Sequence, residues 1–277
     1  CVAPGARACP RAAPTAAPTA QPEAAGASPL VADWDAVEAL LDRRVPELLA
    51  ELGVPGAAVA LVRDGEPALV RGYGLADVAA GRPVDGDTVF QAASISKTLT
   101  AWGVMRLVEQ GALELDAPVG RYLTRWQLPP SPYDHDGVTI RRLLSHTAGL
   151  SLHGYPGIAP GQPLPTLEES LSGGHPGAED VRVVSEPGTT YAYSGGGYTL
   201  LQLVIEEVTG ERFADYMRRE VLLPLGMERS SFTWDEALRP ATAIGYDRAG
   251  QPQPNYLFIE HGPAGLYSTA SDLARFA

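Results

Sequence analysis

The spacing of apolar residues along the chain predicts both helices and antiparallel strands. Apolar positions at helical spacing predict four main helices, over residues 34–52, 94–110, 198–208 and 213–222. Two short strands, 57–63 and 67–73, flank Asp64–Gly65, a pair typical of a hairpin turn. Because the strands and helices do not alternate as βαβ units, this order indicates an α+β fold.

Single residues refine these boundaries. Asp33 is expected to cap the first helix, and Pro46 to kink or interrupt it. Gly210 should end the third main helix. Residues 256–259 are expected to form a further strand, and the proline- and glycine-rich stretch 154–178 a surface loop.

The composition excludes several classes of function. The chain of 277 residues has 21 basic and 33 acidic residues, a net charge of −12, so it lacks the basic footprint of a nucleic-acid-binding protein. No apolar run approaches the roughly 20 residues of a membrane-spanning helix. With only two cysteines and no paired histidines on a helix, we expect neither a disulfide framework nor a metal site, and no cofactor.

Residues 1–29 differ in composition from the rest of the chain. They contain 11 alanines and 6 prolines and almost no large apolar side chain, so we expect a disordered tether. A first residue Cys1 followed by such a tether resembles a mature bacterial lipoprotein, which predicts a lipid anchor at Cys1 and an extracytoplasmic location, periplasmic or at the cell surface. The alternative is that the sequence begins partway through a longer chain.

Lys97 is the single lysine among the 21 basic residues. Because a buried lysine can lose its proton and an arginine effectively cannot, a position that keeps lysine in an arginine-rich chain is a candidate for chemistry. The alternative is a solvated surface lysine.

A hydroxyl lies three residues before this amine, in Ser94-Ile95-Ser96-Lys97 at the expected start of a helix. At that spacing both side chains share one helix face. A serine needs a neighbouring base to become a nucleophile, and a neutral buried lysine can act as one. A helix N-terminus could also stabilise the developing oxyanion. The alternative is that Ser94 only caps the helix.

A second cluster, residues 191–198, places tyrosines and Ser194 before three glycines and the start of a helix. A tyrosine whose pKa is lowered by a nearby ammonium can carry protons between a serine and a leaving group. A packed loop with a glycine turn is the structural alternative.

Several segments in this order resemble the superfamily of serine β-lactamases and penicillin-binding proteins, in particular its branch of class C β-lactamases, D,D-peptidases and related esterases. The resemblance covers roughly residues 33–277 and is carried by the segments Ser94-x-x-Lys97, Leu143–Leu150, Pro187–Thr189, Tyr193-Ser194, Pro224–Met227 and Gly265–Leu273.

The resemblance implies a helix-flanked antiparallel sheet beside an all-helical region at about 100–229, within a hydrolase domain that spans 30–277. It also implies Ser94 as the acylated nucleophile, Lys97 as its activator and Tyr193 as the shared general acid and base.

Two departures from the family pattern stand out. The asparagine of the Tyr-x-Asn motif, which helps to bind substrate, is replaced by Gly195. This weakens the expectation of efficient β-lactam hydrolysis and leaves esters and D-amino-acid amides. The late Lys/His-Thr-Gly triplet is not found before Ala277, so we expect a C-terminally truncated domain that is itself inactive or unstable.

The sequence therefore predicts a serine hydrolase that forms an acyl-enzyme with a small-molecule or short-peptide substrate carrying an ester, amide or β-lactam carbonyl. The alternative is a non-catalytic module that binds cell-wall peptide or a protein partner.

Overall fold

A computed structural model describes residues 33–277, which fall into two units divided between Asp42 and Arg43. Helix α1 (Trp34–Leu52) begins in the first unit, where the carboxylate of Asp33 accepts the amide of Ala36 at 3.2 Å, as a helix cap does. The helix continues through Pro46, so the alternative of an interruption is wrong, while the alternative of a kink stays a prediction. A proline removes a single donor, and the hydrogen bonds of the turns on either side keep the helix intact.

The predicted tether of residues 1–29 and the predicted lipid anchor at Cys1 lie outside the described residues. The extracytoplasmic location stays a prediction. Among residues 33–277, no helix combines the length and the apolar character needed to cross a membrane.

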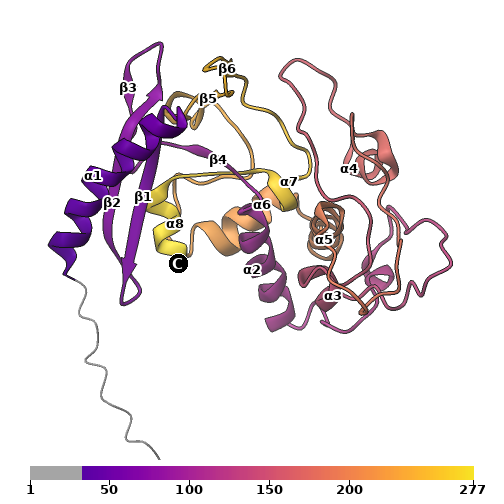
Figure 1. The fold of residues 1–277 in the computed structure, drawn as a ribbon. Helices are drawn as coiled ribbons and strands as arrows, with labels where there is room; N and C mark the ends of the chain where they lie inside the picture. The colour runs from indigo at the N-terminus through magenta and orange to yellow at the C-terminus, as the bar shows by residue number, and fades with distance from the viewer. Residues whose placement is uncertain (1–32) are drawn as a thin grey trace, which may run out of the picture. The chain divides into compact units, whose positions relative to one another are not determined.

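In the second unit, the predicted hairpin is confirmed. Strands β1 (Gly56–Arg63) and β2 (Glu66–Asp77) pair antiparallel, and β3 (Arg82–Pro83) extends this sheet in the order β1-β2-β3. Asp64 and Gly65 have φ values of 53° and 80°, the left-handed pair that a two-residue hairpin turn requires. Helix α8 (Ala270–Phe276) packs against β1 and β2 (Figure 1).

The main hydrophobic core lies among the helices of the second unit. Helix α2 covers Ser96–Glu109, α5 covers Gly195–Thr209, and α6 (Phe213–Met217) continues into the turn η3 (Arg218–Leu222). Fully buried side chains from these helices form its centre, among them Leu99, Leu200, Leu203, Ile205, Phe213 and Met217.

Both helices that carry candidate residues begin at positions other than those predicted. Helix α2 begins two residues later than expected, so Ser94 lies in a turn before it. Helix α5 begins at Gly195, three residues earlier than expected, because the hydroxyl of Ser194 caps it by accepting the amide of Gly197 at 2.9 Å. The three glycines therefore form the first turn of the helix.

Shorter elements connect this framework. They are η1 (Val119–Tyr122), α3 (Ile140–Leu144), α4 (Leu167–Glu169), η2 (Ser170–Gly174), η4 (Arg239–Ala241), β5 (Gly245–Tyr246) and β6 (Pro252–Gln253). The expected loop 154–178 thus contains helical turns, the first closed by a capping box between Thr166 and Glu169. The strand expected over 256–259 is wrong: Leu257 makes one isolated bridge, to Ile158, and one bridge does not propagate a strand.

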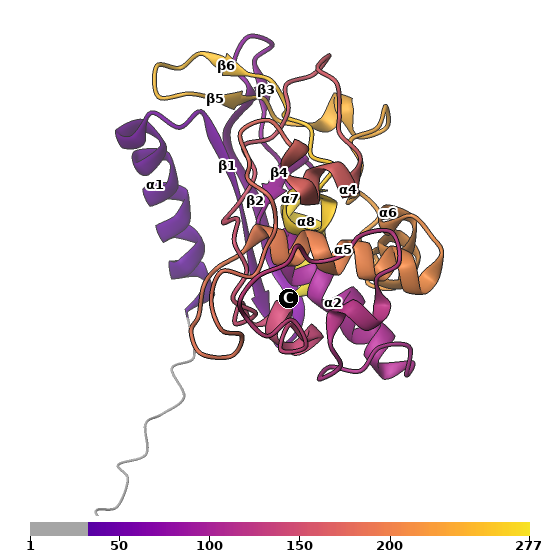
Figure 2. The same ribbon diagram turned by 90° about the vertical axis from the view of Figure 1, so that its right-hand side faces the viewer.

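Two strands far apart in the sequence bring the candidate site together. Strand β4 (Phe90–Ala93) pairs antiparallel with β7 (Leu266–Ser268), and β4 leads directly into the turn before α2. The short helix α7 (His261–Ala264) precedes β7 and packs against α2, α5 and β4, as Figures 1 and 2 show. This arrangement places the end of β4, the first turn of α2 and the start of α5 around α7.

Candidate active site

Ser94 is exposed in the tight turn that joins β4 to α2. The residue before it, Ala93, has a φ of 45°, a left-handed conformation that costs a non-glycine residue energy and is typical of functional turns. Ser96 holds this turn: its hydroxyl donates to the carbonyl of Ala93 at 2.5 Å and accepts the amide of Leu266 at 2.9 Å. The turn is therefore tied to strand β7 as well as to α2.

Lys97 lies behind Ser94 and is buried, with 7% of its surface exposed. Its Nζ atom is 3.2 Å from the hydroxyl oxygen of Ser94 and donates to the carbonyl of Pro263 at 2.9 Å. Burial lowers the pKa of Lys97, because a desolvated ammonium is disfavoured, and the interaction with Tyr193 opposes that shift only in part. The amine is thus available in its neutral form at a lower pH than an exposed lysine.

Tyr193 completes the group, since the Nζ atom of Lys97 lies 4.8 Å from the centre of its ring. Burial of the phenol raises the pKa of Tyr193, but hydrogen bonding to Lys97 and Ser94, together with the charge of Lys97, outweighs burial and lowers it. The structure therefore brings Ser94, Lys97 and Tyr193 together from two distant segments of the chain.

Two histidine rings pack against Tyr193 and fix its position. The ring of His146 lies 4.4 Å from the phenol ring and that of His153 lies 4.9 Å from it, centre to centre. Nδ1 of His146 accepts the amide of Ser194 at 3.1 Å, and its carbonyl accepts the amide of Ala192 at 2.8 Å. Burial and the charge of Lys97 lower the pKa of His146, which keeps Nδ1 unprotonated as this contact requires.

Gly195, predicted from the family pattern as the substrate-binding position, is buried at the first position of α5. Its amide donates to the carbonyl of His153 at 2.9 Å. A Cβ atom at position 195 would lie 3.0 Å from that oxygen and 3.1 Å from Cα of Gly154. The backbone of residues 153–154 therefore takes up the space in which a side chain of residue 195 would begin.

This close approach predicts that Gly195→Ala destabilises the protein. Overpacking of this kind typically costs about 1–3 kcal/mol, so the midpoint of urea unfolding should fall. The matched control is Gly120→Ala, where a Cβ atom would meet nothing within 4 Å and φ lies outside the left-handed region. Equal midpoints for the two variants would contradict the expected crowding at position 195.

Sequence reasoning missed several groups that shape the site. The carbonyl of Pro263 is 166 positions away from Lys97, and a backbone acceptor leaves no signal in a sequence. In the sequence, Ser96 is only a middle residue of the Ser-x-x-Lys motif and His153 only one of five histidines, so neither pattern indicates a role in the site. Their roles depend on segments that meet only in the folded chain.

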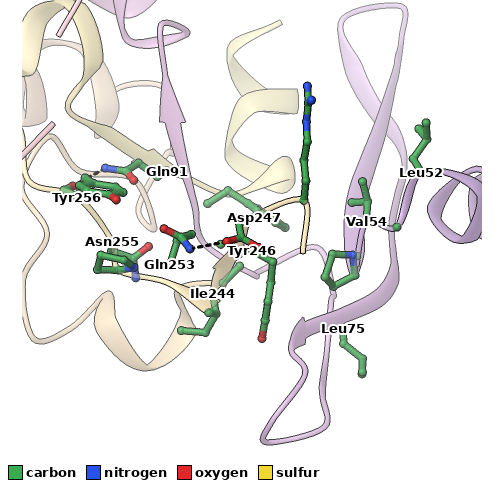
Figure 3. Close-up of a pocket in the computed structure, with 18 residues that line it drawn as sticks. Leu52, Val54, Leu75, Gln91, Ile244, Tyr246, Asp247, Gln253, Asn255 and Tyr256 are labelled. Carbon is green, nitrogen blue, oxygen red and sulfur yellow. Dashed lines mark hydrogen bonds between the residues drawn. The ribbon is translucent and has the colours of Figure 1, made fainter. Parts of the chain in front are cut away.

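A cavity of about 510 Å³ lies between hairpin β5–β6, strand β4 and the residues that lead into β1. Figure 3 shows Gln91 of β4 at one side of it, with its amide donating to the carbonyl of Tyr256 at 2.6 Å. Ser94, Lys97 and Tyr193 are not among its lining residues, so the cavity is separate from the three polar groups. Within residues 33–277, no three metal-binding side chains gather into a cluster.

Comparison with known proteins identifies the class to which this fold belongs. A family model described as Beta-lactamase matches residues 41–277. Esterase EstB of Burkholderia gladioli is 36% identical over 248 residues, which cover 83% of this chain and 60% of the esterase. The octameric penicillin-binding protein homologue from Pyrococcus abyssi has a TM-score of 0.72 at 32% identity, covering 88% of this chain and 55% of that one.

A third similar protein, the D-alanine carboxypeptidase AmpC from Burkholderia cenocepacia, has a TM-score of 0.71 at 29% identity and covers 88% of this chain and 64% of that one. The predicted α+β fold of β-lactamases and penicillin-binding proteins is thereby confirmed. The chain belongs to the Beta-lactamase family, and the proteins similar to it include an esterase and a D-alanine carboxypeptidase. It spans between about half and two thirds of the length of these three proteins.

Proposed function

We propose that this protein is a serine hydrolase that cleaves an acyl substrate through a covalent acyl-enzyme on Ser94. The observation that carries the proposal is the contact of 3.2 Å between the Ser94 hydroxyl and the buried amine of Lys97, with Tyr193 interacting with both. A nucleophile within hydrogen-bond reach of a base, which is itself oriented by a third group, is the arrangement that covalent catalysis requires.

Lys97 and Tyr193 act as one proton-accepting pair. Because both pKa values are lowered, the pair loses a proton more readily than a separate lysine and tyrosine would. A neutral amine beside a phenol and an ammonium beside a phenolate differ only in the position of one proton, so the two groups titrate as a pair. Either form presents an unprotonated atom to Ser94.

The reaction then follows in two balanced halves. The Ser94 oxygen bonds to the substrate carbonyl carbon while its proton passes to the pair. The bond from that carbon to the leaving oxygen or nitrogen breaks, the leaving atom takes the proton from the pair, and an ester to Ser94 remains. Water attacks this ester, gives a proton to the pair, and the carboxylic acid departs as the proton returns to Ser94.

For the substrate we infer an ester or a D-amino-acid amide in preference to a β-lactam. The inference rests on Gly195, where the family pattern has an asparagine side chain and this chain has the backbone of residues 153–154 close by. It agrees with the names of two of the three similar proteins described above, an esterase and a D-alanine carboxypeptidase. A panel of p-nitrophenyl esters, D-alanine amides and nitrocefin should therefore show faster turnover of the ester or the amide than of nitrocefin.

Reaction with a fluorophosphonate probe tests the nucleophile directly. The described residues contain the assembled group of Ser94, Lys97 and Tyr193, so we expect the folded chain to be labelled, contrary to the inactivity that the missing late triplet alone predicts. Peptide mass spectrometry should locate the adduct on Ser94, and neither Ser94→Ala nor heat-denatured protein should take the label. Labelling at another residue would remove Ser94 from the mechanism. A folded protein that takes no label would favour the alternative of a module that binds cell-wall peptide.

A further inference from the structure

The core of the second unit contains a polar pair that the proposed reaction does not use. Nδ1 of His175 lies 2.9 Å from Oε1 of Glu260, and neither side chain has any exposed surface. The hydroxyl of Ser170 also donates to Oε1 of Glu260. Burying an ionisable group costs free energy unless the group is paired. A fully buried pair is therefore expected to have a specific role in the structure or in the reaction.

Glu260 belongs to a short stretch of backbone, residues 259–263, that passes between α2 and α5. On α5, the amide of Gln202 holds this stretch at two points: Nε2 donates to the carbonyl of residue 259 at 3.0 Å and Oε1 accepts the amide of Gly262 at 2.9 Å. On α2, the hydroxyl of Thr100 donates to the carbonyl of Gly262 at 2.9 Å. The side chain of Glu260 attaches the same stretch to two further residues, Ser170 in the turn η2 and His175.

This stretch ends at the group that holds the candidate base. The carbonyl of Pro263 is the 2.9 Å acceptor of Lys97 Nζ. A carbonyl oxygen can only accept, so it takes one N–H of Lys97 whether the amine is neutral or charged. With one N–H fixed in this way, the remaining directions of the nitrogen point to its other neighbours, Ser94 and Tyr193. The position of this carbonyl therefore limits the lone pair of the neutral amine to one of these two directions, toward Ser94 or toward Tyr193.

We propose that Glu260 and His175 form a positioning pair, which holds the 259–263 stretch so that the Pro263 carbonyl orients the amine of Lys97 toward Ser94. The proposal rests on the proposed function of Ser94 and Lys97. Neither Glu260 nor His175 touches the reacting atoms; they act through the backbone between Glu260 and Pro263. Sub-ångström placement of a base is the kind of geometry on which rate depends steeply.

The test measures two constants for the fluorophosphonate probe separately, the maximal acylation rate kinact and the half-saturating concentration KI. For Glu260→Gln we expect kinact to fall by about tenfold with KI unchanged, because a displaced base slows the chemical step more than binding. His175→Asn should have a similar effect, and the double variant should be no slower than the worse single variant, since both act through one contact.

The first-order constant kinact describes only molecules that react, so a smaller folded fraction does not change it. The matched control is Asp272→Asn, another buried acid, which accepts hydrogen bonds from Ser230 and from the amide of Arg229. It should lower the unfolding midpoint and leave kinact unchanged.

The outcomes separate the two proposals. If the wild-type chain takes no label, the proposed function fails. If it labels at Ser94 and Glu260→Gln labels with the wild-type kinact, the positioning pair is wrong while the nucleophile stands. Should both single variants fail to fold, the double variant Glu260→Met/His175→Phe replaces the pair by apolar groups of similar size, which cores often tolerate. A wild-type kinact in that variant would also overturn the proposal.

Discussion

Replacing Lys97 by arginine is expected to slow acylation of Ser94 by roughly 10²- to 10⁴-fold, the range typical for loss of a positioned general base. The variant keeps the positive charge but not the chemistry, because a guanidinium effectively never gives up its proton and so offers no lone pair to the serine hydroxyl. The measurement is the pseudo-first-order rate of fluorophosphonate labelling at fixed probe concentration.

The pH dependence of the labelling rate gives a second test of Lys97. In the wild-type chain the reactive form is the deprotonated one, so the rate should rise with pH through the pKa of the amine. Because burial lowers the pKa of Lys97, this rise should be centred below the ordinary lysine value of 10.5. Lys97→Arg should lack the rise over that range.

The matched control is Arg141→Lys, a basic exchange on the surface, where Arg141 pairs with Asp116. It should leave the rate and its pH dependence unchanged. A near-wild-type rate in Lys97→Arg would remove Lys97 from the proposed mechanism.

Tyr193→Phe gives the second large expected effect, a loss of about 10²- to 10³-fold in acylation rate, because it removes a group that shares and relays the proton. The ring contacts with His146 and His153 remain possible for phenylalanine, so the unfolding midpoint should stay close to that of the wild type. The phenol also raises the pKa of Lys97. Without it, the pH at which the remaining activity rises should shift downward.

The control for this variant is Tyr191→Phe. Tyr191 lies two positions away with 69% of its surface exposed, and its ring also faces His146, at 5.8 Å. Labelling of this control should proceed at the wild-type rate. If the two tyrosine variants behaved alike, Tyr193 would have no special part in proton transfer.

Much of the framework could be predicted from local patterns. The hairpin followed from Asp64–Gly65, because a two-residue turn needs left-handed backbone that this pair adopts at low cost. The main helices followed from their apolar spacing. The first residues of α2 and α5 could not be predicted in this way. Ile95 caps α2 without a side-chain hydrogen bond, so no capping residue marks its start. The glycines at the start of α5 have a low helix propensity, which packing overrides.

The candidate site, like the fold, could be predicted only in part from the sequence. The residue types and the spacing of Ser94 and Lys97 pointed to nucleophilic chemistry, since three positions bring two side chains within reach in a first helical turn. The sequence alone could not say that Lys97 is buried. Nor could it say that a carbonyl 166 positions away accepts a hydrogen bond from the amine of Lys97, because both facts depend on α7 packing between α2 and α5.

For this protein the sequence by itself determined the acidic, helix-rich α+β character, the hairpin, and the identity of the candidate nucleophile and base. Each of these depends on composition or on residues that are close together in the chain. Only the tertiary structure decided the lowered pKa values of Lys97 and Tyr193, the crowding at Gly195 and the buried contact of Glu260 with His175. These depend on desolvation and on distances between segments that are remote along the chain, and such distances are set when the core packs, not by any local pattern.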